Sequence, residues 1–350
     1  MEKRTCGSSD LELSVLGLGC WTFGGGEYWG EQSQKDVNEV VHAAVDQGIN
    51  YFDNAEVYNE GRSESSFGEA LKEISRDKVI IGSKVSTSNC YKDTLIEHCE
   101  GSLKRMKADY IDLYMIHWPI HPNSIKHYTN DPAIITNPPT IEEAIEAMQI
   151  LVKDGKIRYF GVSNFGVNRL EEVLSHDALP VANQVVYNLI SRGIEYSVLP
   201  FCQENNIGII GYMTLMQGVL AGKFDGIENI PEWRKRTRHF NKDRTELSRH
   251  GEEGAEYEMT LVLDEMNKIS MDTGITMSDL ATTWVVANKS ITCSIVGARN
   301  LDQLKLNTGA LEAPITPGII NSLNDASEPI KEKLGDHIDI FEGAENDRTI

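Results

Sequence analysis

The sequence predicts a (β/α)8 barrel, an α/β fold, with long loops at the C-terminal face of the barrel. Eight short apolar runs, rich in β-branched residues, recur along the chain, and amphipathic helical patterns lie between them. The runs are almost continuously apolar, as expected of parallel strands that are buried on both faces. Eight strands with helical crossovers favour a closed barrel, with an open doubly wound sheet as the alternative.

The predicted strands alternate with helices whose apolar residues fall on one face. The clearest helix covers residues 34–47, where valines and alanines form one stripe and Gly48 ends it. Two further helices are predicted over residues 94–106 and 141–153. The eight predicted strands cover residues 14–19, 49–53, 78–84, 110–117, 157–163, 181–187, 207–212 and 291–296.

Three stretches interrupt this alternation. Residues 118–139 carry five prolines and show no helical period, and residues 213–254 are long, polar and rich in arginine. Both follow predicted strands, so both are expected at the C-terminal face of the barrel. The second segment is expected to be either a lid over a cofactor or a solvated loop. Residues 315–327 are predicted to form a helix. An acidic tail is expected from about 329 to 350, with its last dozen residues frayed.

The composition is that of a globular protein with an acidic surface. Its 350 residues are 40% hydrophobic, which suffices for a sizeable core and excludes intrinsic disorder. We expect a single barrel domain over residues 1–350. With 33 Lys and Arg against 53 Asp and Glu, the net charge is −20, which argues against nucleic acid or an anionic membrane surface as a partner.

The six cysteines form no Cys-x-x-Cys pair, and their irregular spacing argues against a disulfide framework and against structural zinc. The N-terminal residues contain no continuous apolar stretch of signal-peptide length, and no run of 18 apolar residues occurs. The expected location is therefore a reducing cytoplasm.

Several common motifs are absent. The segment Gly17-Leu-Gly19 lacks the third glycine of the dinucleotide fingerprint of an open sheet, and the segment 218–223 has one residue too few for a P-loop. A proline between His117 and His121 breaks the helix that would bring both histidines to one metal ion. No metal site is predicted.

Polar side chains end several of the predicted strands. They include an acid, Asp53, a lysine, Lys84, and a histidine, His117. Each alone also has a structural interpretation, such as helix capping by Asp53, and nearby Tyr58 could be a packing residue. In a barrel, however, the strand ends meet on one face, where active sites of this fold lie, so the set favours a proton-transfer site. The other polar residues at strand ends are Ser163, Asn164, Gln184 and Tyr212.

The same residues carry a resemblance to the aldo-keto reductase superfamily, which extends from about Arg4 to Leu323. The stretch Asp-Asn-Ala-Glu-Val-Tyr-Asn-Glu-Gly-Arg-Ser-Glu, residues 53–64, looks like the signature of that family. Segments 203–224 and 233–244 look most like the bacterial branch that includes the inositol-operon reductase-like proteins. Further elements match in family order at Lys84 and in segments 112–118, 155–165, 211–215 and 295–299.

This resemblance implies an NAD(P)H-dependent carbonyl reductase or alcohol dehydrogenase with four catalytic residues. Tyr58 is expected to be the general acid or base, with Lys84 lowering its pKa from about 10 and Asp53 keeping the lysine charged. His117 is expected to donate a hydrogen bond to the substrate oxygen. The hydride comes from a nicotinamide cofactor, because no side chain can supply one.

The resemblance also assigns a cofactor site. Ser163, Asn164 and Gln184 are expected to bind the carboxamide, and Tyr212 to stack on the nicotinamide ring. Arg299, at a predicted helix start, suits a 2′-phosphate, which favours NADP over NAD. The other expected contacts are Leu215, Gly218 and Lys223 along the pyrophosphate, and Gly297, Gln303 and Asn307 at the adenosine end.

The chain departs from the family pattern in places. Met213-Thr214 replaces the usual Ser-Pro after the stacking tyrosine, and Val296 replaces a common proline. Segment 118–139 is longer than in many relatives and should reshape the substrate mouth. Aromatic rings that suit sugar faces as well as aromatic carbonyls are expected around the substrate: Trp21, Tyr28, Trp29, Trp118, Tyr91 and Trp233.

Three functions compete. The first is an NADP-dependent oxidoreductase acting on a small carbonyl or alcohol, namely an aldehyde, a ketone or an oxidised sugar or cyclitol. The second is a cofactor-sensing interaction protein, because potassium-channel β subunits resemble this family, although the intact catalytic set argues against it. The third is a barrel isomerase or aldolase that forms a Schiff base on Lys84, which leaves segment 295–307 unexplained.

Overall fold

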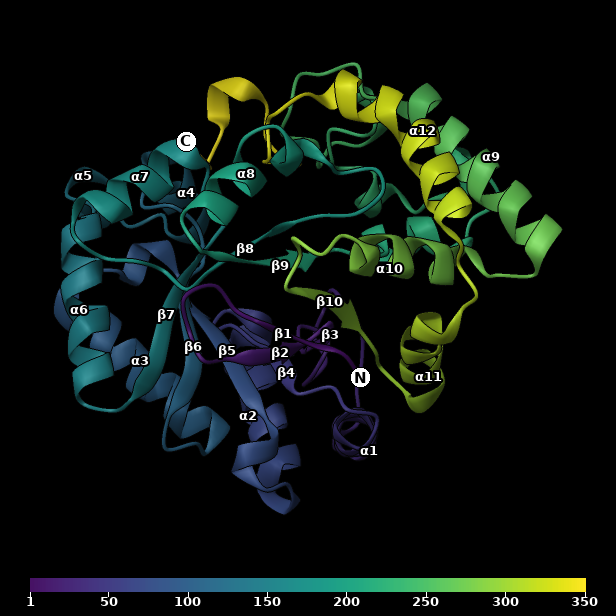
Figure 1. The fold of residues 1–350 in the computed structure, drawn as a ribbon. Coiled ribbons are helices and arrows are strands. Elements are labelled where there is room, and N and C mark those ends of the chain that lie inside the picture. Colours follow the sequence, from purple (N-terminus) through teal and green to yellow (C-terminus); the bar gives the residue numbers. More distant parts are fainter.

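The computed structural model describes residues 1–350, and its centre is a closed barrel of eight parallel strands (Figure 1). Going round the barrel, the strand order is β10-β3-β4-β5-β6-β7-β8-β9. The predicted (β/α)8 fold is confirmed, and each predicted strand is present with its ends shifted by at most two residues. The strands are β3 (Leu16–Gly19), β4 (Tyr51–Asp53), β5 (Ile80–Val85), β6 (Ile111–Ile116), β7 (Ile157–Ser163), β8 (Ala182–Val186), β9 (Gly208–Tyr212) and β10 (Cys293–Gly297).

Helices surround the barrel and bury their apolar stripes against its outer face (Figure 1). The three helices predicted first correspond to α1, α3 and α6; Ser33 caps α1, and Thr140 with Glu143 forms a capping box on α6. No helix is long and apolar enough to cross a membrane. The helices are α1 (Gln34–Asp46), α2 (Arg62–Ala70), α3 (Lys92–Met106), α4 (Pro122–Tyr128), α5 (Pro132–Thr136), α6 (Ile141–Lys153), α7 (Val167–Ser175), α8 (Val198–Glu204), α9 (Glu256–Thr273), α10 (Met277–Ala287), α11 (Leu301–Gly309) and α12 (Pro317–Leu334).

A short hairpin closes the N-terminal end of the barrel. Strand β1 (Lys3–Thr5) pairs antiparallel with β2 (Glu12–Ser14), and the sequence gave no indication of this pair. The buried side chains of Leu11 and Leu13 pack with inward-facing barrel residues such as Tyr51. With one end plugged, access to the interior is left to the C-terminal ends of the strands.

The proline-rich segment 118–139 contains two short helices, α4 and α5, so the expectation that it lacks helix is wrong. Each begins with a proline in its first turn, where the missing backbone N–H costs no helical hydrogen bond. His121 caps α4 by accepting from the backbone N–H of Asn123, and Asp131 caps α5 in the same way. Prolines here start helices instead of preventing them.

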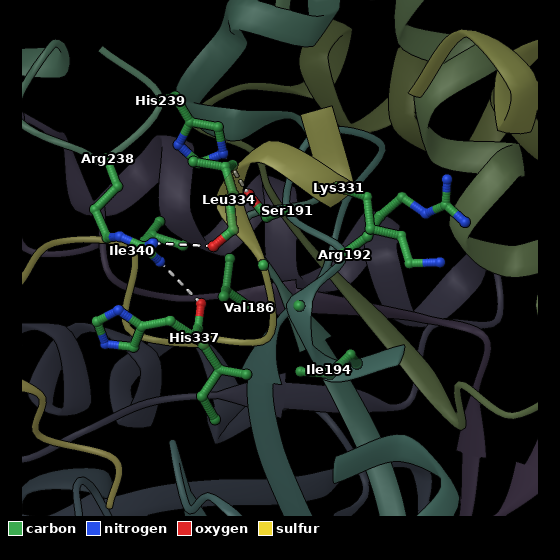
Figure 2. Close-up of a pocket in the computed structure, with 13 residues that line it drawn as sticks. Val186, Ser191, Arg192, Ile194, Arg238, His239, Lys331, Leu334, His337 and Ile340 are labelled. Carbon is green, nitrogen blue, oxygen red and sulfur yellow. Dashed lines mark hydrogen bonds between the residues drawn. The ribbon is translucent and has the colours of Figure 1, made fainter. Parts of the chain in front are cut away.

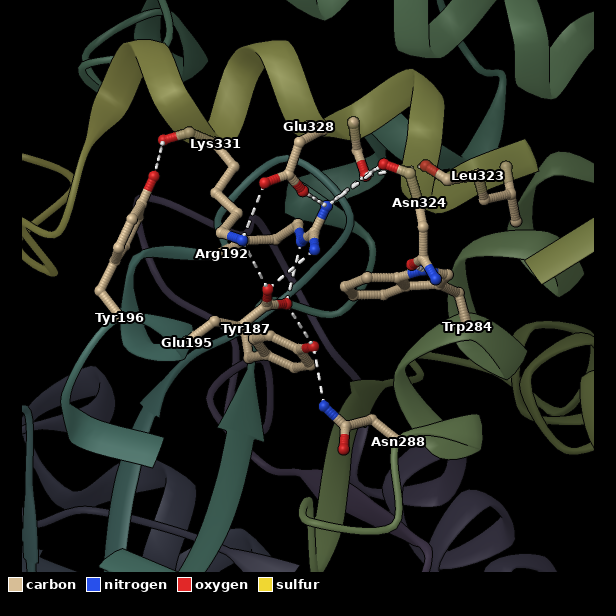
Figure 3. A network of polar contacts seen from close by, with 11 residues as sticks. Tyr187, Arg192, Glu195, Tyr196, Trp284, Asn288, Leu323, Asn324, Glu328 and Lys331 are labelled. Carbon is tan, nitrogen blue, oxygen red and sulfur yellow. Dashed lines mark hydrogen bonds and ion pairs between the residues drawn. The ribbon is translucent and has the colours of Figure 1, made fainter. Parts of the chain in front are cut away.

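The predicted helix over 315–327 is confirmed as α12, which continues past the expected tail boundary at 329 and ends at Leu334. A polar network fastens it to the loop after β8 (Figure 3). Arg192 donates to Glu195 at 2.8 Å and to the Ser327 hydroxyl at 2.9 Å, and it lies 3.1 Å from Glu328. The residues that follow α12 therefore lie near the C-terminal face of the barrel.

The last residues pack against the barrel, so the expectation of a frayed end is wrong. Arg238 donates to the carbonyls of Leu334 and His337 at 2.9 and 3.0 Å, beside a small pocket between β8 and the tail (Figure 2). Further on, Arg348 forms a buried, two-contact pair with Asp339 at 2.7 and 2.8 Å. The tail is held in place by the ion pair between Asp339 and Arg348 and by the hydrogen bonds from Arg238.

The arginine-rich segment 213–254 is packed into the structure at its centre. His239 and Phe240 are fully buried, and Lys235 and Arg238 are nearly so. The stretch 235–240 is therefore not a solvated loop, whereas residues on either side of it, such as Lys223 and Lys242, are exposed, and the lid stays a prediction.

Removing the Arg105 side chain is expected to destabilise the fold by about 3 kcal/mol, because it leaves a buried carboxylate unpaired. The fully buried Glu64 accepts from Arg105 Nε at 2.6 Å and from Ser83 at 2.5 Å. Thermal unfolding of Arg105→Met should show the loss. The double variant Glu64→Gln/Arg105→Met should recover part of it, and equal losses in both variants would contradict this account.

Candidate active site

Three residues that the sequence predicted as catalytic meet at the ends of β4 and β5. Lys84 is fully buried, and its Nζ lies 2.9 Å from Asp53 Oδ2, 2.7 Å from the Asn54 carbonyl oxygen and 3.1 Å from the Tyr58 hydroxyl. An ammonium has three N–H donors, so these three contacts use all of them. The arrangement fixes the position of the Tyr58 hydroxyl relative to one carboxylate and one lysine.

The loop after β4 positions Tyr58 through a left-handed turn. Asn59 and Glu60 have φ values of 50° and 59°, and Gly61 has 82°. The Asn59 amide donates to the carbonyls of Trp21 and Phe23, each at 2.8 Å. Asparagine and glycine tolerate this backbone region better than other residues, which explains why the segment Asn-Glu-Gly follows the tyrosine.

Tyr58 is held as a protonated phenol. Burial raises its pKa well above the ordinary value, and the Asp53 carboxylate raises it further. The nearby Lys84 ammonium does not outweigh these two effects, so the lowered pKa expected from the sequence is not found. A phenol that keeps its proton suits donation to a carbonyl oxygen.

His117 follows β6 and lies beside Tyr58. The two ring centroids are 5.8 Å apart, and His117 Nδ1 is buried without a hydrogen-bond partner. Burial lowers the pKa of His117 well below its ordinary value, and the positive charges of Lys84, His127 and Arg348 lower it further. The imidazole is therefore neutral near pH 7, and a neutral imidazole can donate one hydrogen bond.

The four residues expected at the nicotinamide form one connected group. The Tyr212 hydroxyl donates to Asn164 Oδ1 at 2.8 Å, Asn164 Nδ2 donates to Ser163 Oγ at 3.0 Å, and Ser163 Oγ donates to the Gln184 carbonyl at 2.9 Å. The Gln184 side chain also donates to Asp53 Oδ1 at 2.7 Å. Gln184 thus joins this group to the catalytic set, a contact that sequence reasoning missed.

The residues expected along the pyrophosphate lie on the loop after β9. Gly218 has a φ of 93°, and an added Cβ there would lie 3.4 Å from both Lys223 Cδ and Arg234 Nη1. Arg234 Nε is buried without a partner. Two basic side chains therefore border Gly218. The backbone N–H of Gly218 donates to the carbonyl oxygen of Leu215 at 2.8 Å. The sequence had marked Arg234 only as part of an arginine-rich loop.

The residues expected at the adenosine end surround the start of α11. The Gln303 side chain accepts from the backbone N–H of Arg299 at 2.9 Å, and Asn307 donates to the Gly297 carbonyl at 3.0 Å. The Arg299 guanidinium donates to Gln32 at 2.9 Å and to the Glu31 carbonyl. Gln32 was missed because it lies in an irregular loop far away in sequence.

Four of the aromatic residues expected at the substrate form one group beside Tyr58. Trp21 stacks on Tyr58 at 5.8 Å and on Tyr28 at 5.3 Å, and Trp29 and Trp233 pack edgewise against Tyr28. Two others lie apart from this group. Trp118 packs under Arg348 at 3.8 Å, and the hydroxyl of Tyr91 donates to the Asn137 carbonyl.

A dinucleotide fits these residues. Basic side chains without carboxylate partners border Gly218. His117, whose ring lies beside that of Tyr58, has a buried nitrogen without a partner, and Gly297 is exposed with open space where a side chain would be. An anionic phosphate chain needs such fixed positive charge, and backbone approach needs such glycines.

Comparison with known proteins agrees with this fold. The profile of the "Aldo/keto reductase family" matches residues 15–328. The chain belongs to the aldo/keto reductase family, and it is an NAD(P)H-dependent oxidoreductase.

Three relatives illustrate the range of the family. Aldo-keto reductase YhdN of Bacillus subtilis is 32% identical over 87% of this chain and 87% of its own length. The NADH-specific methylglyoxal reductase of Escherichia coli is 26% identical over 95% of this chain and 100% of its own. A crystal structure of an aldo-keto reductase from Klebsiella pneumoniae in complex with NADPH has a TM-score of 0.66 at 26% identity, covering 93% of this chain and 95% of that one. The inositol-operon-like branch stays a prediction.

Proposed function

We propose that this protein is an NADP-dependent reductase that interconverts a small carbonyl compound and its alcohol, with Tyr58 as proton donor and acceptor. The observation that carries this proposal is the contact of Lys84 Nζ with both Asp53 and the Tyr58 hydroxyl. Aldehydes, ketones and oxidised sugars or cyclitols are the proposed substrates. Cyclitols are included because segments 203–224 and 233–244 resemble the inositol-operon branch.

In this proposal the side chains hold and move one proton. A bound nicotinamide supplies the hydride, that is two electrons and one hydrogen, to the carbonyl carbon. Tyr58 gives its proton to the carbonyl oxygen, which completes the alcohol, while neutral His117 orients that oxygen. Lys84 and Asp53 hold the Tyr58 hydroxyl in place.

The cofactor would be held by the residues described above. Ser163, Asn164, Gln184 and Tyr212 would hold the nicotinamide, and Arg299 a 2′-phosphate. Two facts bear on the choice between NADP and NAD: the Arg299 guanidinium meets only an amide and a carbonyl, never a carboxylate, whereas one relative is NADH-specific. The free positive charge favours NADP. The remaining phosphate and adenosine contacts would come from Leu215, Gly218, Lys223, Arg234, Gly297, Gln303 and Asn307.

A Schiff base on Lys84 is disfavoured. An amine that attacks a carbonyl must be reachable and unprotonated. The Lys84 side chain is 0% exposed, and its three donors are directed at three acceptors.

The direct test is the absorbance of the reduced nicotinamide with purified protein and a carbonyl panel. The panel contains methylglyoxal, aromatic aldehydes, ketones and oxidised sugars and cyclitols, each with NADPH and NADH. We expect consumption, with kcat/KM at least about tenfold higher for NADPH, a difference of about 1.4 kcal/mol. Arg299→Gln should reduce that preference. Tight NADPH binding without turnover across the panel would instead favour the cofactor-sensing alternative.

A further inference from the structure

Arg236 is a cation without an anionic partner in an acidic protein. No carboxylate lies within 4.0 Å of its guanidinium, and its Nε is buried without any hydrogen-bond partner. The shortage is not one of acids, because the chain carries 53 of them. The next three arginines along the chain each pair with a glutamate. These pairs are Arg238 with Glu252, Arg244 with Glu256 and Arg249 with Glu342.

Two aromatic rings, those of Tyr28 and Trp21, link the Arg236 guanidinium to Tyr58. Its central carbon lies 5.6 Å from the ring centroid of Tyr28 and 5.3 Å from that of Phe341. Tyr28 stacks on Trp21, and Trp21 stacks on Tyr58. A guanidinium packed through its flat faces leaves its N–H edge free for an anion.

A second series of contacts runs from Phe341 to the residue that follows His117. Phe341 lies 6.0 Å from the central carbon of Arg348, and Arg348 lies 3.8 Å over Trp118, the residue after His117. The buried pair with Asp339 neutralises Arg348. Arg236 keeps an uncompensated charge, as does Arg234, which stacks on Trp233 and borders Gly218 in the expected cofactor site.

Helix α4 contains no acidic residue that could pair with Arg236. His127 lies on the same side, and burial together with the positive charges of Arg348, Arg249 and Arg236 lowers its pKa to about 4. The imidazole is neutral near pH 7, so the local field is positive although the whole chain carries −20.

We propose that Arg236 binds an anionic group, a carboxylate or a phosphate, on a substrate whose carbonyl reacts at Tyr58. This inference rests on the proposed reductase function and names its substrate class. The rings of Trp21, Tyr28 and Phe341 would pack against the apolar part of the substrate between its two polar ends. The anion must therefore be remote from the carbonyl.

Two substrates that differ only in charge test this. 4-Carboxybenzaldehyde carries the anion, and methyl 4-formylbenzoate replaces it with a neutral ester. With NADPH, we expect the wild type to have a kcat/KM ratio in favour of the acid. In Arg236→Met this ratio should fall about tenfold to a hundredfold, the usual contribution of hydrogen bonds to a charged group. Arg236→Lys should recover part of it, and 0.5 M salt should reduce it.

Matched controls separate the outcomes. Arg244→Met removes an arginine of the same loop that is paired with Glu256, and it should leave the ratio unchanged. An Arg236→Met variant that lowers kcat/KM for acid and ester equally would overturn the proposal. So would one that weakens NADPH binding by the same factor, because Arg236 would then belong to the cofactor site.

A binding measurement keeps the inference independent of turnover. Calorimetric titration of 4-(hydroxymethyl)benzoate into the protein with NADP should show binding that Arg236→Met abolishes. Equal affinity of both proteins would refute the inference, whereas binding that depends on Arg236 without turnover of any compound of the carbonyl panel would refute the reductase function alone. Glyceraldehyde 3-phosphate against glyceraldehyde then decides between phosphate and carboxylate.

Discussion

Replacing Tyr58 by phenylalanine is expected to lower kcat for carbonyl reduction by about a hundredfold to ten-thousandfold, the range found for loss of a general acid. The variant removes one oxygen atom, and with it the proton that the carbonyl oxygen needs. Trp21 can still stack on the ring, and the residues expected to bind the cofactor are not touched. NADPH affinity, measured by fluorescence titration, should stay within about twofold.

The pH dependence of carbonyl reduction should also reflect the raised pKa of Tyr58. Because burial and Asp53 raise the pKa of Tyr58, the acid form is present throughout the neutral range, and reduction should not decline until the pH exceeds the ordinary tyrosine value. Tyr114→Phe is the matched control, since its buried hydroxyl has no partner. Turnover retained in Tyr58→Phe, or lost equally in Tyr114→Phe, would rule out Tyr58 as the acid.

The barrel could be predicted because its signal is repeated and local. Each strand buries both faces, so each appears as an apolar run whatever its neighbours are. The hairpin of β1 and β2 was missed because three-residue strands carry no periodicity. Helices α4 and α5 were missed because their prolines, which usually end helices, occupy the first turn.

That the candidate catalytic residues meet could be predicted from the topology. Asp53 and Lys84 end neighbouring strands, and parallel strands place their ends on one face. Contacts across the barrel follow no such rule. The hydrogen bond from Gln184 to Asp53 and the unpaired state of Arg236 depend on which side chains meet in space. The pKa of Tyr58 was also misjudged, because the sequence shows the lysine but not the burial.

Replacing Lys84 by methionine is expected to lower kcat by about a hundredfold or more, because the Tyr58 hydroxyl loses the group that positions it. The same change leaves Asp53, which is 4% exposed, without its cation. Breaking a buried pair in this way costs about 3–5 kcal/mol of stability. Low activity alone would therefore not separate a catalytic role from a folding defect.

The double variant Asp53→Asn/Lys84→Met separates a catalytic role of Lys84 from a folding defect. It removes both charges, and the asparagine can still accept from the Gln184 amide that now donates to Asp53. We expect the melting temperature to return most of the way to that of the wild type, because no buried charge is left unpaired. Activity should stay at the level of Lys84→Met, since nothing replaces the contact with the Tyr58 hydroxyl. Activity that returns together with stability would show that Lys84 acts by supporting the fold, and Tyr58 would then need another partner.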